Sequence, residues 1–361
     1  MAVKIVKGKM LPIGVDLGSS AVKLAQLRVT DSSYELIAAA ASDVPPACRG
    51  DFQARLGFYS TAIRQLLRAN SFHGRECVLS LPAELTFVHH VRIPKTHPDQ
   101  VQAAVLREIQ GKLPFPAGEA EIRHIVAGDV LGEGEARQEV IVVAVPRSIL
   151  LNHLTVAHRA KLDVAAINVE PCAIVECFGR LFRRTNDQKR TILFVDVGQA
   201  STQVVLSHGN RIVFARNVGI AGDQLDQAIA EGVSIPPEQA QQIRRDLAAS
   251  EERTGSEEEL YGLLAEPLAA LAGELTQCLR YYESVFRNQS IERAIFLGGQ
   301  ARDRRLCQSI AQHLNLPAQI GDPLVRIATA QDGSFEAGLD RREPQPRWAV
   351  AVGLSIGGEA A

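Results

Sequence analysis

Two stretches of this sequence repeat one short pattern, in which an apolar strand carries an aspartate into a glycine turn. The first is IGVDLGSSAVKLAQLRV (residues 13–29), and the second is FVDVGQASTQVVLSHGNRIVFAR (residues 194–216). Each turn precedes a β-patterned run, so both stretches predict a strand, a turn and a returning strand. Glycine lets backbone N–H groups approach an anion closely, and a carboxylate can hold the neutralising cation. Because Asp16 and Asp196 lie 180 residues apart, about one domain's length, the pattern predicts two phosphate-binding turns in a duplicated body.

Length and composition describe an ordinary globular protein with room for two domains or one duplicated α/β body. The chain has 361 residues, 46% hydrophobic and 22% charged, and its formal net charge of −2 argues against wholesale binding to nucleic acid. The six cysteines show neither CxxC pairs nor metal-ligand spacing, which favours free thiols in a reducing compartment. No apolar run has the length of a signal-peptide core or a membrane span. We therefore expect a cytoplasmic protein that reaches a membrane only through partners.

The pattern of apolar residues divides the chain into five parts. Residues 1–83 predict a strand meander, a helix and a buried strand, which together form the first part of one lobe. The pattern of apolar residues changes over residues 84–165 and predicts a small, self-contained α+β block, which we interpret as an inserted subdomain. Residues 166–190 contain a connecting helix that completes the first lobe, and residues 191–340 form a second lobe. The small apolar helix within residues 341–361 is expected to return to the first lobe.

Three further segments carry expectations that a structure can test. Residues 260–287 predict one long helix whose leucine stripe is a core face rather than a coiled coil. A charged link is expected over residues 250–259, and residues 317–332 look rich in loops. His89 and His90 occupy successive strand positions, so they point to opposite faces and cannot hold a metal together.

Five segments resemble, in order, the actin-like ATPase superfamily, whose fold has two related lobes with a nucleotide between them. They are a first phosphate segment VDLGSSAVKLAQL, a connecting helix INVEPCAIVECFG, a second phosphate segment VDVGQASTQVVL, an adenosine segment IFLGGQARDRRL and a closing helix WAVAVGLSIGG. The expected fold is therefore α/β, with two lobes and an inserted α+β subdomain.

Within that superfamily, the inserted block resembles the type IV pilus assembly protein PilM family, in the FtsA/PilM branch. The resemblance rests on VQAAVLREIQGKLPFPAGEAEI and on EVIVVAVPRSILLNHLTVAHRAKLDVAAINVEPCAI, and with the other segments it covers residues 13–358. The chain departs from the family at Ala160-Lys161-Leu162, where a glycine is usual. The resemblance implies a partner like the inner-membrane protein PilN, whose N-terminal peptide would dock near Leu113 and Phe115.

The resemblance also implies a site for ATP with Mg²⁺. The residues expected to face the phosphates are Gly18, Ser19, Ser20, Lys23, Gly198, Gln199, Ala200, Ser201 and Gly222. Asp16 and Asp196 would hold the metal, mostly through water, and Asp196 and Glu170 are the catalytic candidates. Gly298, Gly299, Arg302 and Arg244 would surround the adenosine.

Some of these assignments have a second interpretation. Lys23 could be a solvated strand-edge lysine, and Arg244 could belong to a solvated run of charges. Glu170 could position water or metal, or it could complement the dipole of the helix that it begins. Gln241 replaces an acid that is usual in the family and so removes one acceptor for the ribose.

The function implied by the resemblance is that of a cytoplasmic, ATP-binding scaffold in type IV pilus assembly, with slow ATP hydrolysis or none. It would associate with a PilN-like protein, with other pilus assembly proteins and, through self-association, with copies of itself. Two alternatives stay open. One is an actin-like component of a type II secretion or cell-division assembly, and the other is a small-molecule kinase of the same superfamily.

Overall fold

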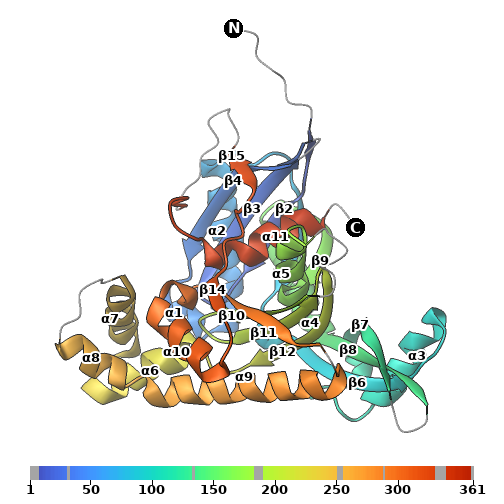
Figure 1. Ribbon diagram of the computed structural model, residues 1–361. Helices are drawn as coiled ribbons and strands as arrows, with labels where there is room; N and C mark the ends of the chain where they lie inside the picture. The colour runs from blue at the N-terminus through green and yellow to red at the C-terminus, as the bar shows by residue number, and fades with distance from the viewer. Residues whose placement is uncertain are drawn as a thin grey trace. The chain divides into compact units, whose positions relative to one another are not determined.

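The computed structural model describes residues 8–30, 33–131, 135–182, 190–249, 255–287, 289–329 and 339–358 (Figure 1). The chain forms two compact units. Unit 1 comprises Met1–Pro82, Ser148–Arg180 and Asp322–Ala361, and unit 2 comprises Ala83–Arg147 and Leu181–Gly321. The inserted subdomain over residues 84–165 stays a prediction, because the two units show only which residues pack together compactly.

Unit 1 is built on one mixed sheet. Its strands are β1 (Lys9–Met10), β2 (Ile13–Leu17), β3 (Ala21–Val29), β4 (Tyr34–Asp43), β5 (Glu76–Leu81), β9 (Asp163–Val169) and β15 (Ile327–Thr329). The strand order is β15-β4-β3-β2-β5-β9, with β1 paired to β3. The expected meander is β2, β3 and β4, which pair in antiparallel fashion, whereas β5 and β9 continue parallel to β2. Every residue of β2 is buried, as is usual for a strand covered on both faces.

Helices cover both faces of this sheet. They are α1 (Pro46–Arg49), α2 (Phe52–Ala69), α4 (Arg147–Arg159), α5 (Glu170–Gly179) and α11 (Ala349–Gly357). Apolar residues of α2 and α4 share one core with β2 and β3, while α11 packs against β2, β3, β5 and α5 (Figure 1).

Two glycines bring α11 very close to its neighbours. A Cβ atom on Gly14 would lie 2.0 Å from the carbonyl oxygen of Ala351, and one on Gly353 would lie 1.8 Å from that of Ala173. Real Cβ atoms do not approach so closely, so glycine is required at both positions. The helix therefore packs directly on the backbones of β2 and α5.

Unit 2 contains a five-stranded sheet and a three-stranded sheet. The larger sheet has the order β12-β11-β10-β13-β14, formed by β10 (Thr191–Val197), β11 (Thr202–His208), β12 (Arg211–Val218), β13 (Ile291–Leu297) and β14 (Ala318–Ile320). The smaller has the order β6-β8-β7, formed by β6 (Phe87–Pro94), β7 (Ala120–Leu131) and β8 (Ala136–Pro146), and it packs on α3 (Pro98–Ile109). Both the strands and the helix of residues 84–146 match the α+β pattern of that part of the sequence.

The remaining helices of unit 2 enclose the core of the larger sheet. They are α6 (Gly222–Val233), α7 (Pro237–Ala249), α8 (Gly255–Gly262), α9 (Ala265–Val285) and α10 (Arg304–Leu314). The leucine stripe of α9, including Leu268, Leu271 and Leu275, is buried in this core, so its prediction as a core face is confirmed.

The two large sheets share one strand order. In unit 1 the strands β2, β3, β4, β5 and β9 lie in the order third-second-first-fourth-fifth, and in unit 2 the strands β10 to β14 do the same. The first three strands form an antiparallel meander in each sheet, and the last two run parallel to the first. This repeated topology is what the two aspartate turns predict.

Three expectations about local structure were wrong. The helix over residues 260–287 is interrupted, because α8 ends at Gly262 and α9 begins only at Ala265. Residues 255–259 of the expected charged link belong to α8, while residues 250–254 lie outside the described part of the chain. Of the segment 317–332, which was expected to be rich in loops, residues 318–320 form β14 and residues 327–329 form β15, strands too short for sequence periodicity to detect. Residues 330–332 lie outside the described part of the chain.

Candidate functional site

Asp16 lies buried near the end of β2, opposite Lys23 in the pairing of β2 with β3. The Nζ atom of Lys23 donates to Oδ2 of Asp16 over 2.5 Å, and the hydroxyl of Ser80 lies 3.4 Å from Oδ1. Directly opposite residues share a face of an antiparallel pair, so strand register brings the two charges together. Lys23 is thus ion-paired rather than a solvated strand-edge lysine.

Hydrogen bonds from α2 and from the loop after β4 fix the turn of Gly18, Ser19 and Ser20. The hydroxyl of Tyr59 in α2 donates to the carbonyl of Gly18 over 3.1 Å, and the amide of Val44 donates to the carbonyl of Ser20 over 2.8 Å. A Cβ atom on Gly18 would lie 3.1 Å from the carbonyl oxygen of Ala21. The turn is therefore tight, and its two serines are half-buried.

Glu170 is the first residue of α5 and directly follows β9. Because β2, β5 and β9 are parallel, their carboxyl ends meet at one edge of the sheet, where ligands of open α/β sheets usually bind. Gly18 and Glu170 lie at this edge, separated by β5. A carboxylate in the first turn of a helix also complements its dipole, so both interpretations of Glu170 remain predictions.

In unit 2, Asp196 occupies the position on β10 that Asp16 occupies on β2. The amide of Gly198 donates to the carbonyl of Ser201 over 3.0 Å and closes the turn, and a Cβ atom on Gly198 would lie 2.9 Å from that oxygen. Asp196 pairs in register with Gln203 of β11, which pairs in turn with Asn217 of β12. These three polar side chains form a row on one face of the sheet.

Gly298 directly follows β13 and lies beside this aspartate. It has a φ angle of +87°, a conformation that favours glycine, and a Cβ atom here would lie 2.3 Å from the carbonyl oxygen of Val197 and 2.4 Å from Oδ1 of Asp196. A Cβ atom on Gly299 would have nothing within 4 Å. The sequence motif Gly298-Gly299 therefore contains one glycine that the fold requires and one with open space around it.

Four side chains of unit 2 form a closed ring of hydrogen bonds, which we call the four-residue ring. Arg244 donates from Nε to Asp226 (2.7 Å) and from Nη1 to the side-chain oxygen of Gln300 (2.5 Å). Gln300 donates to the side-chain oxygen of Gln199 over 3.0 Å, and Gln199 donates to Asp226 over 2.6 Å. Arg244 is thus a buried member of an ion pair, not part of a solvated run of charges.

Sequence reasoning identified Gln199 and Arg244 but missed Asp226 and Gln300. Asp226 also accepts a hydrogen bond from the side-chain amide of Gln241 over 3.1 Å. Gln241, which stands where the family usually has an acid, therefore supports the four-residue ring. The signal for Asp226 was an acidic residue on the apolar face of α6, among Leu225 and Ile229. Gln300 carried no local signal.

Gly222 begins α6 and lies under the ring. Its amide donates to the carbonyl of Gly198 over 3.1 Å, and the amide of Asp223 donates to that of Gln199 over 2.8 Å. A Cβ atom on Gly222 would lie 2.5 Å from the amide nitrogen of Gln300 and 2.8 Å from the side-chain oxygen of Gln199. The glycine makes room for two side-chain amides, and its N–H donates to the turn that begins at Gly198.

The remaining adenosine candidate and the partner-binding candidates lie apart from the ring. Arg302 is exposed at the end of its short helical turn, whereas Gln300 of the same turn faces the ring. Leu113 and Phe115 are partly buried against the core of the β6-β8-β7 sheet and α3. The ring of Phe115 meets that of Phe87 edge-on, with centroids 6.4 Å apart.

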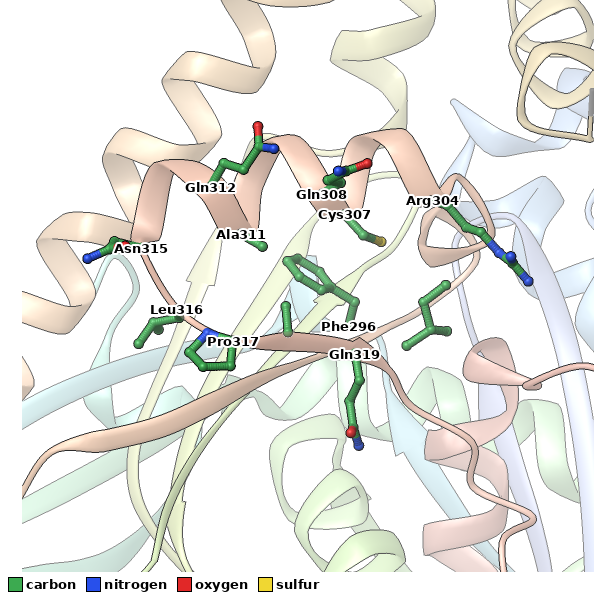
Figure 2. A pocket seen from close by; sticks show the side chains of 12 residues that line it. Phe296, Arg304, Cys307, Gln308, Ala311, Gln312, Asn315, Leu316, Pro317 and Gln319 are labelled. Atoms are coloured by element: carbon green, nitrogen blue, oxygen red, sulfur yellow. The ribbon is translucent and has the colours of Figure 1, made fainter. Parts of the chain in front are cut away.

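A groove of about 640 Å³ lies between α10 and β14, outside all the predicted site residues. Figure 2 shows Phe296 and the sulfur of Cys307 pointing into it from opposite walls. Burial raises the pKa of the Cys307 thiol to about 12, so this cysteine stays protonated near neutral pH.

The residues present fit a phosphate ligand and a hydrated cation. Gly18 and Gly198 close tight turns at the carboxyl ends of β2 and β10, and each turn follows an aspartate. Within the described residues there is no cluster of three or more His, Cys, Asp or Glu side chains suited to a metal. Asp16 belongs to unit 1 and Asp196 to unit 2.

Residues 14–358 match the family model described as type IV pilus assembly protein PilM. The chain belongs to this family. Among solved structures it is similar to one described as a PilM–PilN type IV pilus biogenesis complex, with 23% identity and a TM-score of 0.79 over 96% of this chain and 98% of that chain. It is also similar to the ethanolamine utilization protein EutJ from Carboxydothermus hydrogenoformans, with 14% identity and a TM-score of 0.57 over 98% and 92% of the two chains.

Membership of the PilM family and these structural likenesses confirm the fold expected from the sequence, an actin-like ATPase fold. They also confirm the family that the inserted block suggested. None of the helices described above combines the length and the apolar character that crossing a membrane requires.

Proposed function

We propose that this PilM-family chain is an ATP-binding scaffold of type IV pilus assembly, cytoplasmic and held at the inner membrane by its partners. The observation that carries the proposal is the duplicated strand, aspartate and glycine turn, found at the same place in two sheets of identical strand order. Each such turn provides backbone donors for phosphate oxygens and one carboxylate for the cation that neutralises them.

In this proposal the turns 18–20 and 198–201 hold the phosphates, and Asp16 and Asp196 hold Mg²⁺ through water. Bound Mg²⁺ would supply charge neutralisation for the phosphates. Lys23 is paired with Asp16, so a cation taking over this carboxylate would free the ammonium for a phosphate oxygen. Gly298, Gly299, Arg302 and Arg244 line the adenosine end, and Glu170 and Asp196 would orient water in any slow hydrolysis.

Binding of Mg²⁺ and ATP by the purified full-length chain tests this proposal. Isothermal titration should give saturable binding to the wild type, and Asp16→Asn and Asp196→Asn should each weaken it at least ~10-fold, about the loss of one charge-assisted contact. Asp246→Asn is the matched control, since Asp246 is exposed on α7. Absence of binding to the wild type, or unchanged binding in both site variants, would refute the nucleotide site.

We also propose that the chain binds the N-terminal peptide of a PilN-like inner-membrane protein. The support is family membership together with the similarity to a PilM–PilN complex. Leu113 and Phe115 are half-buried apolar side chains, which leaves part of each ring or chain available to a peptide. Phe115→Ala should weaken binding of such a peptide at least ~10-fold, as measured by fluorescence anisotropy. Leu151→Ala, which changes an exposed residue of α4, should leave the affinity unchanged.

A further inference from the structure

The four-residue ring joins parts of unit 2 that are far apart in the sequence. Gln199 belongs to the second phosphate turn, Asp226 to α6, Arg244 to α7, and Gln300 to the turn after β13. Each of the two amides uses both its oxygen and its nitrogen within the ring, so their orientations are fixed by their neighbours. A change at one member therefore removes hydrogen bonds from its two neighbours in the ring.

Three of the four ring residues are buried, and Gln300 is half-buried, so the polar groups of the ring need hydrogen-bond partners. Gln199, Asp226 and Arg244 have exposed fractions of 6%, 3% and 3%. A buried ion pair is stable only where further hydrogen bonds satisfy its remaining donors and lone pairs. Here Asp226 accepts from Arg244, Gln199 and Gln241, and Gln199 also donates to Asp223 over 2.7 Å.

We propose that Gln199 is a positioning residue for the nucleotide, acting through the ring rather than by contact with the phosphates. Its side chain holds the turn of residues 198–201 to Asp226 and to Gln300, and through these two residues to Arg244. The phosphate and adenosine ends of unit 2 are therefore set in one arrangement before a nucleotide arrives. This inference rests on the proposed nucleotide binding. The sequence predicted that Gln199 faces the phosphates, whereas in this inference its side chain positions other residues.

The variant Gln199→Glu tests this role because it keeps the shape and removes the donor. The new carboxylate would face Asp223 and Asp226, with Arg244 as the one cation of the ring. At pH 8 we expect affinity for Mg²⁺-ATP to fall about 30-fold, since two donors are lost and like charges are opposed. Neighbouring carboxylates raise the pKa of the introduced glutamate, so protonation should restore the donor and reduce the loss to about 5-fold at pH 5.5, relative to the wild type at each pH.

A second variant separates positioning from general damage. In Gln199→Glu with Asp226→Asn, the amide and the carboxylate exchange places, and the asparagine can donate to the glutamate. We expect this double variant to bind at least ~5-fold more tightly than Gln199→Glu at pH 8. The matched control is Gln308→Glu, which adds the same charge on the exposed side of α10 and should bind like the wild type.

The outcomes distinguish this inference from the proposed function. Wild-type binding with the pH-dependent loss and the rescue supports positioning through the ring. Two outcomes overturn it while leaving the proposed function intact. In the first, the wild type binds Mg²⁺-ATP and Gln199→Glu binds it as tightly as Gln308→Glu. In the second, Gln199→Glu loses affinity, and neither lowering the pH nor adding Asp226→Asn reduces that loss. A wild type that binds no nucleotide overturns both.

Discussion

Replacing Gly298 by alanine should disrupt unit 2 locally, and the cost follows from two features of the structure. The φ angle of +87° opposes any side chain, which costs about 1–2 kcal/mol. The new methyl group would lie 2.3 Å from the carbonyl oxygen of Val197, which the sheet holds in place, and such overpacking costs about 1–3 kcal/mol. The free energy of unfolding of this region should therefore fall by about 2–5 kcal/mol.

Hydrogen exchange measured by mass spectrometry can localise this effect. A loss of about 2 kcal/mol corresponds to roughly 30-fold faster exchange of the amides of β10 and β13. Gly299→Ala is the matched control, because a Cβ atom there meets nothing within 4 Å, and it should change stability by less than about 1 kcal/mol. Equal exchange in the two variants would refute the argument that Gly298 is fixed by its contact with β10. The Gly298→Ala variant should also lose binding of Mg²⁺-ATP, since the methyl group would displace the carboxylate of Asp196.

Two further predictions concern pH and packing. Burial opposes ionisation of Glu139, but hydrogen bonds from His90, Tyr281 and Arg92 lower its pKa below the ordinary 4.5. The ionised Glu139 therefore contributes to stability above pH 4.5, and this contribution is lost as the pH falls through the lowered pKa. Urea unfolding should show Glu139→Gln less stable than the wild type by about 1–3 kcal/mol at pH 7, with the difference shrinking below pH 4.5; a constant difference would contradict this. Gly353→Ala should lower the free energy of unfolding by about 1–3 kcal/mol, as measured by urea titration, because the methyl group would collide with α5. Gly273→Ala, at an open position of α9, should instead raise the free energy of unfolding by about 0.5–1 kcal/mol, followed by circular dichroism in the same titration. Equal free energies of unfolding in the two variants would contradict this prediction.

The repeated turns could be predicted from sequence because their determinants are local. An apolar run, an aspartate and a glycine within a few residues are enough to indicate where β2 and β10 end. The ion pair of Asp16 with Lys23 was not predicted, although both residues belong to one hairpin, because it depends on the register of β2 with β3. The actin-like fold was expected from the resemblance of five segments in order, two of which contain these turns.

The four-residue ring could not be predicted, because it depends on long-range packing. Gln199 and Gln300 are 101 residues apart, and each looks like an ordinary polar turn residue in the sequence. Gly222 was assigned to the phosphates because the resemblance to the actin-like superfamily places the start of this helix near the ribose and phosphate. The structure shows a different reason for glycine there, which is the space taken by two side-chain amides.

The division of the chain into units sets the order in which they can be completed during synthesis. Unit 1 takes its core from both ends of the chain, and β2 has one face covered by α11, which begins only at Ala349. About 240 residues separate Pro82 from Asp322, which corresponds to roughly 10–50 s of translation at ~5–20 residues per second. Unit 2 is entirely synthesised in that interval. The nascent chain therefore contains all of unit 2 before α11, which covers one face of the Asp16 hairpin, has been synthesised. During this period the apolar face of the hairpin is exposed, and chaperones would be most needed.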